Sequence, residues 1–172
     1  MSEPTATKTA FHDVAPLQGE ALWFNGARQD VKLPGAWSDD AVSLVEVEST
    51  RGRATGLHTD PSHETFYILE GELLFHVAGE EVRAGAGRTI AIRMGVPHAF
   101  VTLSDRARFL VVNAPGTQDR FFRAGGEPAR HRDFDAAPAP DHERTASAAR
   151  EYGVELLGPP PFAGDAVRAV SG

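Results

Sequence analysis

Four side chains that can bind a metal ion fall within seven consecutive residues, inside the stretch from Gly56 to Gly71. They are His58, Asp60, His63 and Glu64. Imidazole nitrogens and carboxylate oxygens together suit divalent transition metals. A strand-like run, Thr65 to Leu69, follows at once, so the four candidate ligands lie at the start of a predicted strand.

The bulk properties limit what such a site can be part of. The chain has 172 residues, which is enough for one domain with a real core. Its net charge of −7 is unfavourable for nucleic acid and anionic membranes, so neither is expected as a partner. The chain has no cysteine, so any metal must be held by nitrogen and oxygen ligands. No apolar signal core or membrane-spanning run is visible, and we expect a cytoplasmic protein.

Many short strand patterns separated by glycine-rich turns surround the candidate ligands. These runs are residues 21–24, 28–33, 41–49, 65–69, 72–78, 81–84, 88–92, 98–103 and 107–113. Closely spaced strands with few helical patterns are typical of antiparallel sandwiches and barrels. The fold is therefore expected to be mainly β.

The pattern changes after residue 115. A short helix is predicted over residues 118–124, and a second is predicted from His142 to Tyr152, with Asp141 as its N-cap and Gly153 as its stop. We divide the chain into an N-terminal arm (1–16), a β-barrel (17–115) and a C-terminal helical extension and tail (116–172). The last ten residues are expected to be mobile.

Strand parity indicates which of the candidate ligands share an interior. His58, Asp60, Glu64, Phe66 and Ile68 are all even-numbered, so an extended chain in phase points them the same way, although Pro61 can break that phase. His63 then points outward. On a later strand, His98 shares parity with Phe100 and Thr102. The alternative is that the acidic groups are solvated or paired, because an unpartnered buried carboxylate is costly. His76 is interpreted as structural.

Two segments resemble the paired motifs of the cupin superfamily. Residues 56–71 resemble the first motif, Gly-x5-His-x-His-x3-4-Glu-x6-Gly, through His58, Glu64 and Gly71. Residues 87–102 resemble the second, Gly-x5-Pro-x-Gly-x2-His-x3-Asn, through Gly87, Gly95 and His98. More narrowly, residues 20–26 and 152–160 look like the flanks of single-domain cupins grouped with quercetin 2,3-dioxygenases. The resemblance implies an antiparallel double-stranded β-helix, or jelly-roll barrel, with a short helical C-terminal arm.

Three positions depart from the motifs: Asp60 replaces a histidine, Arg93 a proline and Thr102 an asparagine. The implied metal ligands are His58, Asp60, Glu64 and His98. A set with two carboxylates favours Fe, Mn or Ni over Cu, with Zn possible. Three alternatives stay open at Asp60: an altered metal centre, His63 as a replacement ligand, or a site that binds no metal.

The resemblance implies a dioxygenase acting on a flavonol-like or other phenolic or enolic small molecule, with O2 as cosubstrate. Glu64 is the expected general base, and the expected substrate-binding walls are Phe66, Ile68, Phe75 and Phe100. We expect no nucleotide cofactor. We expect the protein to form a homodimer. The alternatives are a non-oxidative cupin enzyme (isomerase, cyclase or lyase) and a metal-free small-molecule binder.

Overall fold

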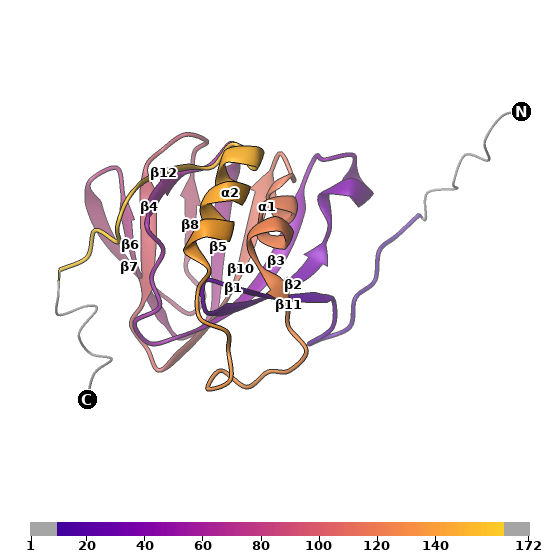
Figure 1. The fold of residues 1–172 in the computed structure, drawn as a ribbon, viewed down its shortest axis with the longest axis horizontal. Coiled ribbons are helices and arrows are strands. Elements are labelled where there is room, and N and C mark those ends of the chain that lie inside the picture. The colour runs from indigo at the N-terminus through magenta and orange to yellow at the C-terminus, as the bar shows by residue number, and fades with distance from the viewer. Residues whose placement is uncertain (1–9, 164–172) are drawn as a thin grey trace, which may run out of the picture.

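The computed structural model describes residues 10–163, which form two antiparallel sheets facing each other (Figure 1). The larger sheet has, in spatial order, β11 (Glu127–Pro128), β1 (Glu20–Phe24), β2 (Ala27–Leu33), β3 (Ser43–Thr50), β10 (Arg106–Ala114), β5 (His63–Glu70) and β8 (Thr89–Ile92). The smaller sheet has β12 (Glu155–Gly158), β4 (Leu57–Thr59), β9 (His98–Thr102), β6 (Glu72–Val77) and β7 (Glu80–Gly85). A short 3-10 helix, η1 (Gly35–Ser38), precedes β3.

The hydrophobic core lies between the two sheets and follows the alternation of their strands. In β5 the even-numbered residues Glu64, Phe66 and Ile68 are buried, whereas His63 and Tyr67 are exposed. The phenylalanines of the core contact one another edge to face, as Phe66 does with Phe75 at a centroid distance of 5.0 Å. The core comprises Leu22, Val31, Val45, Val47, Phe66, Ile68, Leu73, Phe75, Ala84, Ile92, Ala107, Phe109 and Val111.

The C-terminal extension is built into the barrel at several points. Strand β11 pairs with β1, and β12 pairs with β4, so the extension adds one edge strand to each sheet. The helices α1 (Gln118–Gly125) and α2 (His142–Tyr152) lie side by side over the barrel, where Phe24 packs with Phe121, Ala148 and Val154 (Figure 1). The extension therefore contributes to the interior of the barrel as well as to its outside.

The sequence-based expectation of a mainly β, antiparallel fold is confirmed. Asp141 caps α2 as predicted, because its carboxylate accepts a hydrogen bond of 2.9 Å from the backbone N–H of Arg144. Gly153 ends the helix in the left-handed conformation. Strands β4 and β11 and helix η1 have no counterpart among the predicted elements. The division at residues 16 and 115 stays a prediction. The expected mobility concerns residues 163–172, of which 164–172 lie outside the described residues.

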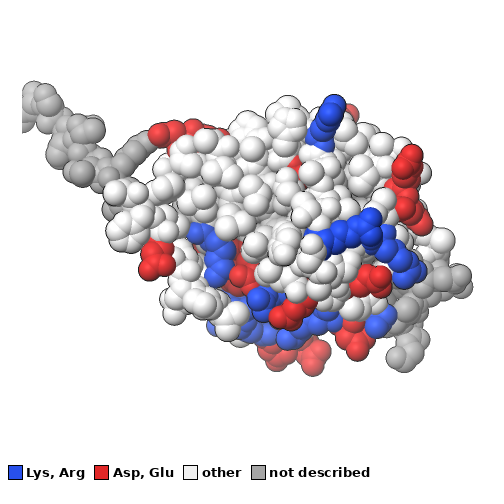
Figure 2. Space-filling view, turned by 180° about the vertical axis from the view of Figure 1, so that it is seen from behind, with Lys and Arg blue, Asp and Glu red and all other residues white. Residues whose placement is uncertain are grey.

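Basic and acidic side chains are interspersed on the face of the molecule seen from behind in Figure 2, without a uniformly basic area there. None of the helices between residues 10 and 163 is both long and apolar enough to span a membrane.

Candidate metal centre

Three strands and one bend bring four candidate ligands to one end of the barrel. The two histidines face each other across the β4–β9 pair, where His58 pairs with His98 and their ring centroids lie 4.4 Å apart. Glu64 comes from the start of β5, and Asp60 from the bend that joins β4 to β5. Gly71, at the other end of β5, has a φ of +79°, and a Cβ there would lie 2.3 Å from the carbonyl oxygen of Arg106. The motif glycine therefore holds the turn that returns the chain to β6.

The ligand atoms of these side chains converge within 4.8 Å of one another. His98 Nε2 lies 2.9 Å from Glu64 Oε2 and 3.3 Å from Asp60 Oδ2. His58 Nε2 also lies 3.3 Å from Asp60 Oδ2. Asp60, Glu64 and His98 are buried and His58 is mostly so, which gives a compact set of two imidazoles and two carboxylates.

Backbone carbonyls fix the orientation of both imidazole rings. His58 Nδ1 lies 2.8 Å from the carbonyl oxygen of Gly56, and His98 Nδ1 lies 2.9 Å from that of Val96. A carbonyl oxygen only accepts, so each Nδ1 carries a proton and donates it. The Nε2 atom of each ring therefore faces the centre of the cluster, as in histidine ligands whose other nitrogen is held by a hydrogen bond.

Two buried amides hold the outer oxygens of the carboxylates. Asn113 Nδ2, on the strand paired with β5, donates to Glu64 Oε1 over 2.8 Å. Gln118 Nε2, at the first turn of α1, donates to Asp60 Oδ1 in a short hydrogen bond. Both amides are almost completely buried. The inner oxygens, Oε2 and Oδ2, are thus left pointing at the imidazoles.

The protonation of the cluster follows from this geometry. Burial by itself raises the pKa of Asp60, but hydrogen bonds and charges from His58 and His98 outweigh it, so the pKa of Asp60 is lowered. Burial opposes a charge on His98, but the hydrogen bonds to Asp60 and Glu64 and the charge of Glu64 raise the pKa of His98 to about 10. Without a metal, the proton on His98 Nε2 is shared between the facing oxygens of Asp60 and Glu64.

The residues fit a divalent metal ion. Adjacent ligands around an octahedral ion with bonds of about 2.1 Å lie about 3 Å apart. The imidazole-to-carboxylate separations of 2.9 and 3.3 Å match that spacing. A cation at the centre would take the place of the His98 proton, while the outer hydrogen bonds keep all four side chains in position.

A mainly apolar cavity of about 110 Å³ opens from the cluster, and His58, Asp60 and Glu64 line its inner end. Phe66 and Phe100 lie in its wall, and their role in substrate binding stays a prediction. Ile68 and Phe75 are instead fully buried core residues outside the lining, because an inward-facing side chain can meet core as readily as cavity. Three further aromatic residues line the cavity and were not predicted from the sequence: Phe24 of β1, and Phe121 and Phe122 of α1.

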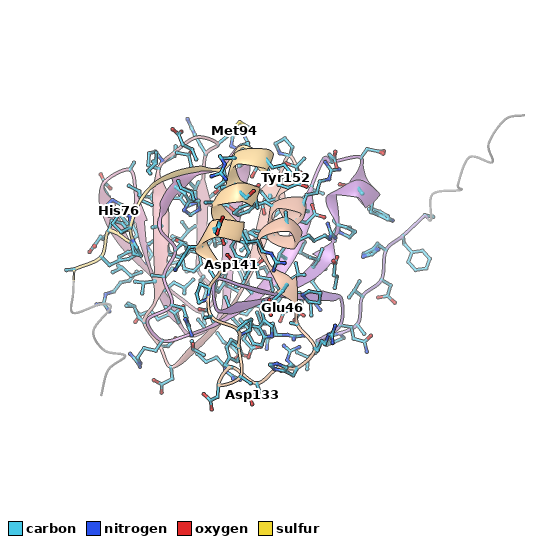
Figure 3. All side chains as sticks on the ribbon, in the orientation of Figure 1. Glu46, His76, Met94, Asp133, Asp141 and Tyr152 are labelled. Atoms are coloured by element: carbon cyan, nitrogen blue, oxygen red, sulfur yellow. The ribbon has the colours of Figure 1, made fainter. Side chains whose placement is uncertain are left out.

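The remaining sequence candidates lie elsewhere. His63 is exposed, and its Nδ1 accepts a hydrogen bond of 3.2 Å from the backbone N–H of Met94, so it lies outside the cluster. His76 faces Phe162 at 6.5 Å on the side of the smaller sheet away from α1 and α2 (Figure 3). Thr102, in the place of the motif asparagine, donates to the hydroxyl of Ser49 over 2.9 Å inside the barrel.

Comparisons with known proteins agree with this architecture. Residues 45–113 match the family model described as Cupin domain. The chain is similar to a quercetin 2,3-dioxygenase of Bacillus subtilis, at 28% identity over 102 residues. That match covers 59% of this chain but only 30% of the relative, so the chain spans less than a third of that protein.

Solved structures show the same fold. An RmlC-like cupin from Shewanella frigidimarina has a TM-score of 0.56 at 18% identity, covering 65% of this chain and 97% of that one. A predicted oxalate decarboxylase from Thermotoga maritima has a TM-score of 0.54 at 23% identity, covering 59% of this chain and 97% of that one. The family match over residues 45–113 and the two facing antiparallel sheets give this chain a cupin domain with the cupin fold.

Proposed function

We propose that this protein is a metal-dependent dioxygenase of the quercetin 2,3-dioxygenase-like group, acting on a phenolic or enolic small molecule. The observation that carries the proposal is the convergence of four ligand atoms whose outer atoms are each held by a hydrogen bond. A structural role alone does not require two buried carboxylates to face two buried imidazoles at the end of a cavity.

The proposed ligands are His58, Asp60, Glu64 and His98, with Fe, Mn or Ni favoured over Cu because half of the set is carboxylate. A bound metal would supply Lewis acidity and reactivity with O2. The Asn113 and Gln118 amides keep the two carboxylates in place. The aromatic walls hold a flat ring against the cluster and exclude water from it.

Glu64 is the proposed general base. Its Oε2 faces the centre of the cluster, whereas Oε1 is held by Asn113. Oε2 is therefore the atom that would accept a proton from a substrate hydroxyl, once Glu64 has moved off a metal held by His58, Asp60 and His98. General-base assistance contributes roughly two to four decades in rate.

The second candidate is a non-oxidative isomerase, cyclase or lyase. The His98–Glu64 hydrogen bond of 2.9 Å favours it, because such a pair can move a proton on and off a substrate without redox chemistry. A metal-free binder is the third candidate, and Asp60 in the place of the motif histidine supports it.

Oxygen uptake separates these functions. Protein loaded with one equivalent of Fe(II), Mn(II), Ni(II) or Co(II) is incubated with a panel of flavonols and simpler enols. The proposal expects substrate-dependent O2 consumption that is lost in Glu64→Gln. Metal binding without O2 uptake for any member of the panel would favour the non-oxidative class. The predicted cytoplasmic location and homodimer stay predictions.

A further inference from the structure

One arginine of the cavity has no counter-ion within the described residues. Arg53 is half-buried in the loop between β3 and β4, and among residues 10–163 it is the only lysine or arginine that lines the cavity. No ion pair or side-chain hydrogen bond joins it to another residue in the part of the chain from 10 to 163. By contrast, Arg51, two residues earlier, pairs with Asp105 at 2.8 Å. A cation kept at a cavity wall without a partner is available to an anionic ligand.

The position of the guanidinium is set by close packing. It lies directly over the turn between β1 and β2, where a Cβ on Gly26 would be 2.8 Å from Arg53 Cζ. Asn25, in the same turn, also lines the cavity. The absence of a side chain at Gly26 therefore gives the guanidinium a fixed place at the cavity wall.

A second polar group in this cavity also lacks a partner. Gln29 is buried, lines the cavity, and its Oε1 has no hydrogen-bond partner within the described residues. A buried amide without a partner is costly, and a polar ligand group would relieve that cost. Arg53 and Gln29 thus supply unpaired polar atoms to a cavity whose remaining wall is mostly apolar.

The strand register gives the backbone separation between the Arg53 segment and His58. Ala54, next to Arg53, bridges Val101 of β9, whereas His58 pairs with His98 of the same strand. These two points are three residues apart along β9, which corresponds to about 10 Å at 3.3 Å per residue. Between them the wall is formed by aromatic side chains such as Phe66 and Phe100.

We infer that the cavity binds an elongated aromatic acid, with its carboxylate at Arg53 and its phenol or enol oxygen at the His58, Asp60 and Glu64 end. The inference deepens the proposed function and rests on it for the orientation at the cluster. A cation at one end and a metal site at the other recognise a molecule with acidic groups on opposite ends of a flat ring. A neutral flavonol offers only one of these contacts.

The test is calorimetric titration with trans-4-hydroxycinnamate and, separately, its methyl ester, which lacks the negative charge that Arg53 would meet and adds one methyl group. We expect the acid to bind about tenfold more tightly than the ester. The preference should disappear in Arg53→Gln and return in part in Arg53→Lys. Arg83→Gln, an exposed arginine of β7, is the matched control and should keep the full preference.

The inference is overturned if the acid does not bind, if acid and ester bind equally to the unaltered protein, or if Arg53→Gln keeps the preference. Oxygen uptake by the metal-loaded protein distinguishes its failure from that of the proposed function. Charge-selective binding without O2 uptake leaves the inference standing and removes the dioxygenase. O2 uptake with neutral flavonols, together with equal binding of the acid and the ester, leaves the dioxygenase and removes the inference.

Discussion

The two ends of the cavity differ in how their charged and metal-binding side chains are paired. At the inner end, every carboxylate and imidazole has a partner for its outer atom, supplied by Gly56, Val96, Asn113 or Gln118. At the end near the β1–β2 turn, Arg53 has no counter-ion within residues 10–163. A small ion of fixed coordination needs rigid ligands, whereas an exchangeable organic ligand needs groups that are free to meet it.

Removal of a ligand should have the largest effect. His98→Ala should weaken binding of Fe(II) or Mn(II) by more than about a hundredfold, since it removes an imidazole and also leaves two buried carboxylates without their shared partner. Calorimetric titration of chelator-treated protein measures this. His63→Ala is the control, because His63 is a histidine five residues from His58 that lies outside the cluster. Equal losses in both variants would remove His98 from the site.

The buried amides should have the next largest effect, and they test whether the inner end depends on its outer hydrogen bonds. Asn113→Ala and Gln118→Ala should each weaken metal binding by about ten- to a hundredfold, because Glu64 and Asp60 lose the contacts that orient them. Gln18→Ala removes an exposed amide and should have no effect. Unchanged affinity in Gln118→Ala would show that the C-terminal extension does not support the metal site.

The pH dependence of metal binding follows from His98. Its pKa is raised from 6.5 to about 10, so its proton stabilises the metal-free protein fully below pH 6.5, and this stabilisation is lost as the pH rises through about 10. Metal binding must displace that proton, so affinity should rise by about tenfold per pH unit between these values. Titrations in buffers of different ionisation enthalpy report the proton released. A flat profile would mean that metal binding does not displace a proton from His98 in this pH range.

The smallest expected effect concerns the cavity wall. Phe100→Leu should weaken binding of an aromatic probe such as trans-4-hydroxycinnamate by roughly three- to tenfold through lost contact area, with metal affinity unchanged. Phe75→Leu should lower the thermal midpoint but leave probe binding intact, because Phe75 lies in the core outside the lining. If Phe75→Leu weakened probe binding and Phe100→Leu did not, the ligand would lie on the core side of Phe66.

Much of this arrangement could be read from local pattern. Period-two alternation gave the inward parity of Glu64, Phe66 and Ile68, and Asp141 and Gly153 marked the ends of α2. Parity distinguishes inside from outside but cannot distinguish core from cavity, and so Ile68 and Phe75 were grouped with Phe66 and Phe100.

The amides and the far walls depend on contacts between distant segments. Gln118 reaches Asp60 across 58 positions, and Phe24 meets Phe121 only because α1 packs over β1. No local periodicity encodes such pairs. One signal was present for Asn113, a polar residue on the otherwise apolar inward face of its strand, directly opposite Glu64.

X-ray absorption at the metal edge of protein loaded with one equivalent of Fe(II) examines the inner end of the cavity most directly. We expect the metal to stay bound through desalting, with nitrogen and oxygen neighbours at about 2.0 to 2.3 Å and outer scattering from two imidazole rings. Loss of the metal on desalting, or a spectrum of the hydrated ion without imidazole scattering, would contradict a metal centre formed by His58, Asp60, Glu64 and His98.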